Sequence, residues 1–173
     1  MEYLDVYTLE GLPTGRTIDR ASAFSCLNPS LDRLLLVHVC VFNSNGKMLL
    51  QRRVLSKDRY PGMWDVSAGG FVHAGESSAD AVKRELLEEI GLDAAKSGID
   101  FVLREPFGLV FDDFYAVYAD PILSELKLQS SEVMDVGWFD RNSVMEMLND
   151  GILVDYPESL ISMMFDTFST CSK

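Results

Sequence analysis

One stretch of the chain, residues 70–92, constrains its fold more than any other. The stretch predicts an amphipathic helix that begins at an N-cap, Ser77 or Ser78, and ends at Gly91. Apolar residues recur at helical spacing and form one arc of this helix: Ala79, Val82, Leu86 and Ile90. The pattern therefore indicates a helix with one apolar face and a separate polar face.

Three glutamates lie on the polar side of this helix. Glu85, Glu88 and Glu89 occupy positions i, i+3 and i+4, so they are expected to crowd onto one face. Like charges at this spacing destabilise a helix unless a cation lies among them. Carboxylate oxygens are hard ligands that suit Mg²⁺ or Mn²⁺. The alternative is a solvated acidic face, which is common for one or two glutamates, but three at this spacing favour a metal site.

The residues before and after the helix predict strands. Residues 34–42 are an apolar run typical of a strand buried on both faces. Residues 43–46 form an Asn-Gly turn, and residues 47–53 return as a second strand. Residues 1–20 predict a short strand followed by a turn. Further strands are expected at residues 64–67, 71–73, 101–105, 109–119 and 134–139.

Two helices are expected after the last strand. Asp140 caps a helix over residues 141–149 that stops at Gly151, and Pro157 suits the first position of a final helix. The apolar face of the final helix contains Leu160, Ile161, Met164, Phe165 and Phe168. This order predicts an α+β fold, an α/β/α sandwich with a mixed β-sheet between helices. The whole chain, residues 1–173, is expected to form one domain.

The charge balance restricts the partners of this domain. Fifteen Lys and Arg residues against 27 Asp and Glu residues give a formal net charge of −12. A protein that follows a nucleic-acid backbone normally carries basic excess, so we expect no nucleic-acid partner. The longest apolar run, residues 34–42, is too short to span a bilayer, so no membrane partner is expected. An anionic small substrate would need a metal and a few local cations to attract it.

The N-terminus and the cysteines indicate where the protein works. The first residues lack the basic-then-apolar order of a signal peptide. Three cysteines, Cys26, Cys40 and Cys171, are widely spaced, odd in number and without a C-x2-C pair. Neither a zinc site nor a disulfide framework is indicated. These features favour a reducing, cytoplasmic location.

The spacing of residues 70–92 also carries a family resemblance. The stretch follows the pattern G-x5-E-x7-R-E-L-x-E-E-x-G-L, formed by Gly70, Glu76, Arg84, Glu85, Leu86, Glu88, Glu89, Gly91 and Leu92. This pattern resembles the signature of the Nudix hydrolase superfamily, with no departure at any fixed position. Residues 2–20 and 57–64 are similar to the branch that contains isopentenyl-diphosphate isomerase and its hydrolase-like relatives.

The resemblance implies a metal site and a reaction. Glu85, Glu88 and Glu89 would bind Mg²⁺ or Mn²⁺, with the carbonyl of Gly70 as a further ligand. The family hydrolyses a nucleoside diphosphate linked to another moiety. Metal ions neutralise the diphosphate oxygens and lower the pKa of a bound water, and a nearby carboxylate removes the water proton. The expected enzyme is a pyrophosphohydrolase that acts on phosphorus-containing anhydrides.

Two further assignments come from the same resemblance. Glu76 and Arg84 would form a buried ion pair that fixes the loop on the helix, a structural rather than a catalytic pair. Glu132 precedes a strand, where many family members place a loop glutamate that acts as a base or an extra metal ligand. The alternative for Glu132 is an ordinary surface glutamate.

Cations close to the signature are candidates for substrate contacts. Arg52, Arg53 and Lys57 are the nearest cations in sequence and could bind substrate phosphate. Because alternate residues of a strand point opposite ways, at most one of the two arginines faces the cleft.

Aromatic residues and histidines near these cations have a structural and a functional interpretation. Trp64, Tyr60 and Phe42 could stack on a base, although such aromatic residues more often belong to the core. His38 lies inside an apolar strand and is expected to be a core histidine with satisfied hydrogen bonds. His73 follows the signature glycine, and nothing else in the sequence marks it as a ligand.

Two alternatives to a hydrolase are considered. The isomerase needs a cysteine after the Pro-Gly-x-Trp segment, but that position falls on Gly69, and the isomerase's metal-binding histidine falls on Phe71. A Nudix domain used as a non-catalytic nucleotide-binding module usually loses signature glutamates, whereas all are present here. The hydrolase is therefore favoured.

Its substrate would be a phosphorylated small molecule, and ADP-ribose, dinucleoside polyphosphates, oxidised nucleotides, coenzyme A and prenyl diphosphates all stay open. Dimers are frequent in the family, so a homodimer is one expected assembly.

Overall fold

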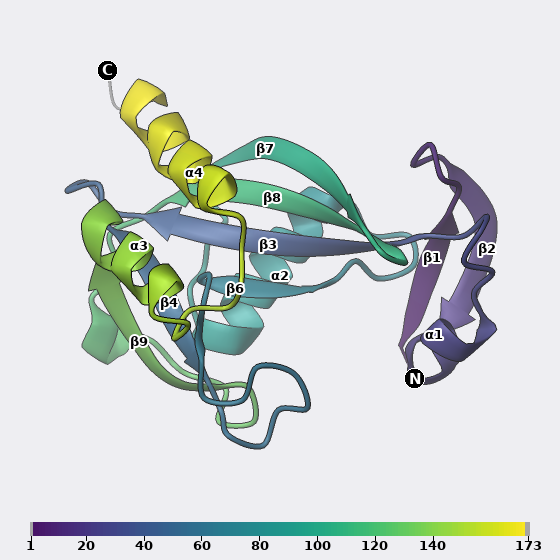
Figure 1. The fold of residues 1–173 in the computed structure, drawn as a ribbon, viewed down its shortest axis with the longest axis horizontal. Helices are drawn as coiled ribbons and strands as arrows, with labels where there is room; N and C mark the ends of the chain where they lie inside the picture. The colour runs from purple at the N-terminus through teal and green to yellow at the C-terminus, as the bar shows by residue number, and fades with distance from the viewer. Residues whose placement is uncertain (1, 172–173) are drawn as a thin grey trace.

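A mixed β-sheet between two helical layers forms the body of the molecule (Figure 1). The computed structural model describes residues 2–171. Helix α2 (Ser78–Ile90) covers one face of the sheet, and α3 (Arg141–Asn149) and α4 (Glu158–Cys171) cover the other. The strands of this seven-stranded sheet are β3 (Leu34–Phe42), β4 (Met48–Arg53), β5 (Trp64–Asp65), β6 (Ala68–Phe71), β7 (Gly98–Phe107), β8 (Val110–Tyr118) and β9 (Val133–Phe139).

Alternation along β3 explains the two layers. Val37 and Val39 pack in the cluster that contains the apolar face of α2, whereas Cys40 and Phe42 pack in the cluster beneath α3 and α4. Successive side chains of a strand point to opposite faces, so one apolar run supplies both clusters. The α/β/α sandwich and its mixed sheet, with β3 parallel to β8 and antiparallel to β4, are confirmed.

The sheet separates between β3 and β4. The two strands pair only through Val41 with Leu49 and Phe42 with Met48. Beyond this point β6 pairs with β3, and β5 pairs with β4. Ser67 lies at the point of separation, where its hydroxyl donates to the carbonyl of Leu49 at 2.6 Å and accepts from the amide of Val41 at 2.8 Å. We call this wedge, lined by β5, β6 and Ser67, the divide.

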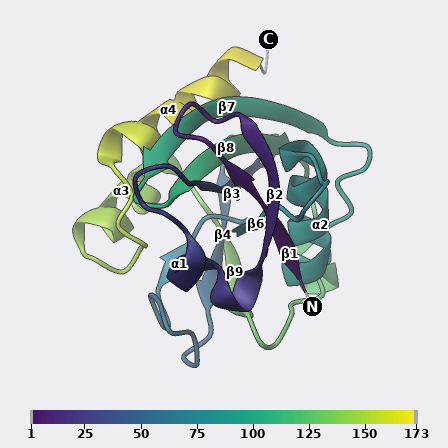
Figure 2. The ribbon, with the colours of Figure 1, turned by 90° about the vertical axis from the view of Figure 1, so that its right-hand side faces the viewer.

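The N-terminal region forms a β-hairpin, whereas the sequence predicts one strand and a turn there. The hairpin consists of β1 (Tyr3–Tyr7) and β2 (Pro13–Asp19), followed by the 3-10 turn η1 (Arg20–Ser22) and the short helix α1 (Ala23–Cys26). β2 has no buried residue, so it lacks the apolar alternation by which a half-buried strand is recognised. The hairpin lies at one end of the molecule, beside α1 (Figure 2).

The hairpin has its own small core and contacts the loop before α2. Leu4, Val6, Ala23, Leu27 and Leu34 form this core. The amide of Ala74 donates to the carbonyl of Tyr3 at 2.8 Å, and the amide of Gly75 donates to the carboxylate of Asp5 at 2.7 Å. The hairpin therefore supports the loop that leads into α2.

Two glycines lie inside a strand rather than between two strands. The sequence predicts strands on either side of Gly69 and Gly70, but both belong to β6 and pair with β3. A Cβ on Gly69 would lie 2.9 Å from the carbonyl oxygen of Val37. Glycine is needed here because the two backbones approach closely, and the pair is not a break in the strand.

The remaining elements follow the expected order. Helix α3 begins at Asp140, whose side chain accepts from the amide of Ser143, and α4 follows Pro157. The turn η2 (Leu123–Glu125) precedes β9. Among the described residues, no helix is long and apolar enough to cross a membrane. Cys26 is exposed and Cys40 is buried, and both are free thiols, while the side chain of Cys171 lies outside the described part of the chain.

Candidate active site

Helix α2 has defined ends that fix its polar residues relative to the sheet. Ser77 is the N-cap, and its hydroxyl accepts a hydrogen bond from the amide of Asp80 at 3.1 Å. Gly91 ends the helix in the left-handed conformation, with φ +71°. Val82, Leu86 and Ile90 are fully buried against the sheet, which defines the face that the helix turns toward it.

The three glutamates of α2 differ in burial. Glu85 and Glu89 are 8% and 7% exposed, whereas Glu88 is an exposed side chain. At 100° per residue, positions 85 and 89 lie beside the apolar arc and position 88 lies further round the helix. The three glutamates share one side of the helix, where NH1 of Arg84 contacts both Glu85 and Glu88, but their burial differs: two are buried beside the sheet, and one faces solvent.

Burial changes the protonation of the two inner carboxyl groups. Burial, reinforced by the charge of Glu85, raises the pKa of Glu89 to about 8. Burial also raises the pKa of Glu85, although the neighbouring Arg84 counteracts this effect. Two buried carboxyl groups that interact in this way favour a bound cation, because a cation stabilises both charges together.

Glu89 extends to the divide in the sheet. Its Oε2 accepts a hydrogen bond from Nε2 of Gln51 on β4 at 2.8 Å, and a second from the amide of Gly69 on β6 at 3.3 Å. Gln51 pairs with Asp65 of β5, and Gly69 belongs to β6, so the two donors lie on opposite sides of the divide. The innermost carboxylate of α2 therefore contacts both walls of the divide.

Gly70 leaves space for the carboxylate of Glu85. A Cβ at position 70 would lie 2.0 Å from Oε1 of Glu85. Even alanine at this position would displace that carboxylate, so the glycine is a steric requirement of the site.

Arg84 is the centre of an ion-pair network around the helix. Its Nε and NH2 donate to the two carboxylate oxygens of Glu76, each at 2.9 Å, and its NH2 also donates to the carbonyl of Phe71 at 2.9 Å. Its NH1 lies 2.7 Å from Oε1 of Glu85 and 3.4 Å from Oε2 of Glu88. Although burial acts in the opposite direction, the hydrogen bonds from Arg84 lower the pKa of Glu76. Arg84 thus joins β6, the loop and α2.

A second set of charged residues lies around β4 and β5, on the side of the divide opposite β6. Lys57 forms an ion pair with Glu132, whose backbone carbonyl accepts from the amide of Val54 at 3.0 Å. NH1 of Arg53 donates to Oδ2 of Asp65 at 3.0 Å. The negative charges of Asp65 and Glu132 both raise the pKa of Glu89 further. Asp65 and Glu132 are therefore close enough to interact with the buried carboxylate of α2.

The two arginines of β4 have different surroundings. Arg52 pairs with Trp64 across β4 and β5 and donates from Nε to the carbonyl of Gly62 at 3.0 Å. Arg53 instead contacts Asp65, as described above. Alternate residues of β4 face opposite sides, so Arg53 shares the face of Gln51 and Arg52 does not.

The aromatic candidates lie in different places. Trp64 packs edge-to-face on Phe139, with ring centroids 5.0 Å apart, in the layer of α3 and α4. Phe42 is fully buried and stacks on Phe168 at 5.4 Å. Tyr60 is 41% exposed and has φ +53° in the loop before β5. Trp64 and Phe42 are therefore packing residues in this arrangement.

No local sequence pattern marks a connected polar group near the divide, formed by Asp65, Tyr156, His38 and Asp112. Asp65 is 9% exposed, and its Oδ1 accepts from the hydroxyl of Tyr156 at 2.6 Å. The hydroxyl oxygen of Tyr156 also lies 3.2 Å from Nδ1 of His38. Nε2 of His38 lies 3.4 Å from Oδ1 of Asp112. His38 is a half-buried histidine with polar partners, as the sequence predicts, but its connection to Asp65 was not predictable from its strand.

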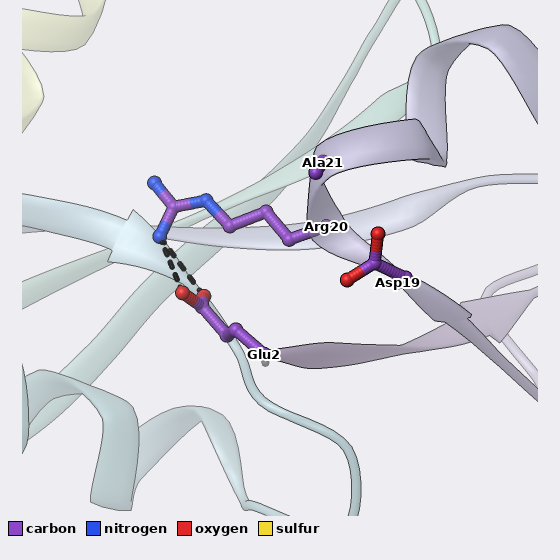
Figure 3. A pocket seen from close by; sticks show the side chains of 4 residues that line it. All are labelled: Glu2, Asp19, Arg20 and Ala21. Atoms are coloured by element: carbon purple, nitrogen blue, oxygen red, sulfur yellow. Dashed lines mark hydrogen bonds and ion pairs between the residues drawn. The ribbon is translucent and has the colours of Figure 1, made fainter.

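Two shallow hollows lie beside the N-terminal hairpin. One, of about 500 Å³, is lined by Glu2, Asp19, Arg20 and Ala21 (Figure 3). NH1 of Arg20 donates to both carboxylate oxygens of Glu2, at 2.9 and 2.8 Å (Figure 3). The other hollow is lined by Glu2, Tyr3, His73 and Ala74. The second hollow adjoins the loop before α2, and the charge of Arg20 in the first counteracts the rise that burial causes in the pKa of Glu85.

The donor set around α2 fits a hard divalent cation. Its side chains that could bind a metal are three carboxylates, of which two are buried, and carboxylate oxygens suit such a cation. The positive guanidinium of Arg84 contacts two of the three, Glu85 and Glu88. Among residues 2–171, however, no three acidic, histidine or cysteine side chains converge as a preformed metal centre. Arg84 keeps Glu85 and Glu88 engaged, so a cation would compete with this arginine for the two carboxylates.

The fold and the site define a class of protein: an α/β/α sandwich in which an acidic helix lies against a separated sheet. A family model described as the NUDIX domain matches residues 32–156, which is more than half of the chain. The chain therefore belongs to the Nudix family.

Relatives of known name agree with this membership. The chain is 36% identical over 122 residues to a Listeria innocua protein named as a Nudix hydrolase, covering 70% of this chain and 72% of the relative. It is 32% identical over 151 residues to an isopentenyl-diphosphate Delta-isomerase of Escherichia coli, covering 83% and 80%. The crystal structure of DR0079 from Deinococcus radiodurans shares the fold, with a TM-score of 0.73 at 21% identity over 93% of this chain and 98% of that one.

Proposed function

We propose that this chain is a metal-dependent hydrolase of a diphosphate linkage, in a nucleoside diphosphate linked to another moiety or in a related organic pyrophosphate. Membership of the Nudix family supports a hydrolase. The observation that carries the proposal is the pair of buried carboxyl groups, Glu85 and Glu89, beside the exposed Glu88. A chain gains no stability from burying two interacting carboxyl groups, so their place on α2 is best explained by a bound cation.

The proposed roles follow from the surroundings of each residue. Glu85, Glu88 and Glu89 would hold Mg²⁺ or Mn²⁺, with the carbonyl of Gly70 as a further ligand. When bound, the metal neutralises charge on the diphosphate and lowers the pKa of the attacking water. Glu132, oriented by Lys57, would accept the proton of that water. The water oxygen forms a bond to phosphorus as the bridging P–O bond breaks.

Arg53 and Lys57 are the proposed contacts to substrate phosphate. Arg53 contacts Asp65 and Lys57 contacts Glu132, and the charges of these two carboxylates both act on Glu89. Arg52 is left out of this role because it is directed to the opposite face of β4. Together these residues make a phosphorylated small molecule the expected partner.

A panel of diphosphate compounds tests the proposal. ADP-ribose, dinucleoside polyphosphates, oxidised nucleotides, coenzyme A and prenyl diphosphates are incubated with Mg²⁺, with Mn²⁺ or with a chelator, and phosphate-containing products are measured. Glu89→Gln should lower kcat by at least roughly 10- to 100-fold without unfolding the domain. Glu146→Gln, an exposed change on α3, is the matched control and should retain wild-type turnover. Near wild-type turnover of Glu89→Gln at saturating metal would refute the metal assignment.

The similarity to an isomerase requires a separate test. Gly69 stands where the resemblance places the isomerase cysteine, and its amide donates to Glu89 instead. We therefore expect no dimethylallyl isomer from isopentenyl diphosphate and Mg²⁺, as followed by NMR. Enzyme-dependent formation of the isomer would overturn the hydrolase proposal. Metal-dependent binding across the panel without any product would instead favour a nucleotide-binding module.

A further inference from the structure

Tyr156 enters the divide from the layer opposite α2. It lies between Leu153 and α4, and its side chain is buried. Its hydroxyl donates to Oδ1 of Asp65 at 2.6 Å, across a sequence separation of 91 residues. Burial, together with the charge of Asp65, raises the pKa of Tyr156 well above its ordinary value, so the hydroxyl keeps its proton. A segment close to the C-terminus therefore contacts a strand that lines the divide.

The hydroxyl of Tyr156 is held by two partners. Its single proton goes to Asp65, and its oxygen also lies 3.2 Å from Nδ1 of His38. His38 is itself held in place, because it stacks on Phe114 with centroids 4.7 Å apart and its Nε2 lies 3.4 Å from Asp112. The position of the hydroxyl is therefore fixed before any substrate binds.

Asp65 passes this constraint to Arg53. Its Oδ1 accepts from Tyr156 and from the amide of Val66 at 2.9 Å, and its Oδ2 accepts from NH1 of Arg53 at 3.0 Å. The carbonyl of Arg59 accepts from Nε and from NH2 of Arg53, each at 3.2 Å. The guanidinium is thus held on two sides.

These contacts leave part of the guanidinium available. They engage three of its five N–H groups, and within residues 2–171 the other two donate to no protein acceptor. Arg53 shares a face of β4 with Gln51, which donates to Glu89 at 2.8 Å. Arg53 also contacts Asp65, which pairs with Gln51 and whose charge acts on Glu89, so the guanidinium lies near the α2 carboxylates.

We propose that Tyr156 and Asp65 are positioning residues that hold Arg53 ready to bind the diphosphate group of the substrate. The inference rests on the proposed function, and it adds that residues of the opposite layer take part in substrate binding. A planar guanidinium binds phosphate through two N–H groups only when its orientation is correct. Arg53 would otherwise lose the rotational freedom of a long side chain on binding, and fixing it beforehand removes that cost.

Binding of a non-hydrolysable probe tests the proposal. Methylenediphosphonate is titrated with Mg²⁺ into the full-length chain, and its Kd is measured by calorimetry. Tyr156→Phe, which removes only the hydroxyl, should raise Kd by about 3- to 10-fold, as expected for the loss of one orienting hydrogen bond. Tyr115→Phe is the matched control, because it removes a hydroxyl bonded to Ser78 at 2.6 Å, away from Arg53, and should leave Kd unchanged.

A double-mutant cycle separates positioning from a general structural effect. If Tyr156 acts through Arg53, then Tyr156→Phe should change Kd in the wild-type chain but not in the Arg53→Ala background. Equal effects of Tyr156→Phe in both backgrounds, or no effect in either, would overturn the proposal. If Tyr156→Phe does not fold, as judged by its melting transition, Asp65→Asn takes its place in the same cycle.

Turnover distinguishes failure of this inference from failure of the proposed function. With a substrate found in the panel, Tyr156→Phe should raise KM by the same factor as Kd and leave kcat within about twofold of wild type. An inactive wild-type chain that still binds the probe through Arg53 would refute the hydrolase and retain the positioning role. If the wild-type chain is active but Tyr156→Phe changes neither KM nor Kd, the positioning role is refuted and the hydrolase proposal stands.

Discussion

Glu89 holds its proton more tightly in the folded chain than in the unfolded chain. Burial raises its pKa from an ordinary value of 4.5 to about 8, and the pKa of Glu85 is raised in the same direction. Wherever the folded state binds more protons than the unfolded state, the free energy of unfolding falls as the pH rises. For Glu89 this loss begins near pH 4.5 and is complete above about pH 8. Its size is on the order of a few kcal/mol.

Thermal unfolding in the presence of a chelator measures this effect. The Tm of the wild-type chain should fall between pH 6 and pH 9, at roughly 2–4 °C per kcal/mol lost. Glu89→Gln carries no ionisable group at this position, so its Tm should fall less over the same range. Glu88→Gln, a change at an exposed position of the same helix, should follow the wild type. Parallel curves for wild type and Glu89→Gln would show that the carboxyl group does not titrate in this range.

The sequence predicts individual site residues when their partners are near in the chain. Glu76, Arg84 and Glu85 share one loop and one helix, so their spacing is enough to predict that they lie together. Asp65 and Tyr156 meet only because β5 lies beside the segment before α4, and no local pattern marks either residue. The spacing predicts that Glu88 lies on the same side of the helix as the other two glutamates, but it does not predict that Glu88 is exposed, because spacing on a helix does not specify how deeply each residue is buried.

At the scale of elements, one arginine, Arg84, joins α2 to the end of β6 and to the preceding loop. Arg84→Ala would remove the two hydrogen bonds from Arg84 to Glu76 and the one from Arg84 to the carbonyl of Phe71. Breaking a fully buried pair costs about 3–5 kcal/mol. The side chains of Arg84 and Glu76 retain 19% and 16% exposure, so we expect a loss of about 3 kcal/mol at most.

Chemical denaturation compares this variant with its neighbour on the helix. Lys83→Ala removes an exposed ion pair with Asp80 and should change the free energy of unfolding by less than about 1 kcal/mol. Arg84→Ala should also lower turnover, because the loop and Glu85 lose their common support. If both variants unfold at the same denaturant concentration, Arg84 is not a structural residue and its role is confined to the reaction.

Elements with local end signals are predicted well, and elements defined by distant contacts are not. Ser77, Gly91 and Asp140 act on backbone groups within a few residues, so the limits of α2 and α3 can be inferred from sequence. β2 has no fully buried residue, and its pairing with β1 makes it a strand. β6 contains two glycines that a sequence pattern interprets as a break.

At the scale of the whole molecule, the N-terminal hairpin is packed as part of the same folding unit. Leu4 is 1% exposed and packs with Leu34, the first residue of β3. Leu4→Ala should therefore cost about 2–5 kcal/mol, as for other large-to-small changes in a core. The loss should appear as one unfolding transition at lower temperature. Calorimetry checks both the size of the loss and the number of transitions.

Leu12→Ala is the matched control for this prediction. Leu12 belongs to the same hairpin but is 62% exposed, so its removal should change the Tm by little. A separate low-temperature transition in Leu4→Ala would show that the hairpin unfolds independently. In that case the expectation of a single domain over residues 1–173 would be wrong.

The separation of β3 from β4 has a consequence for how proteins of this design diverge. The layer of α2 and the layer of α3 and α4 each have their own apolar cluster, and polar atoms in the divide connect them. Substitutions that are distant and share no partners act nearly independently. Mutations in the C-terminal layer can therefore accumulate while the acidic helix stays intact. Descendants of one ancestor can in this way acquire new substrates while they inherit the same chemical step.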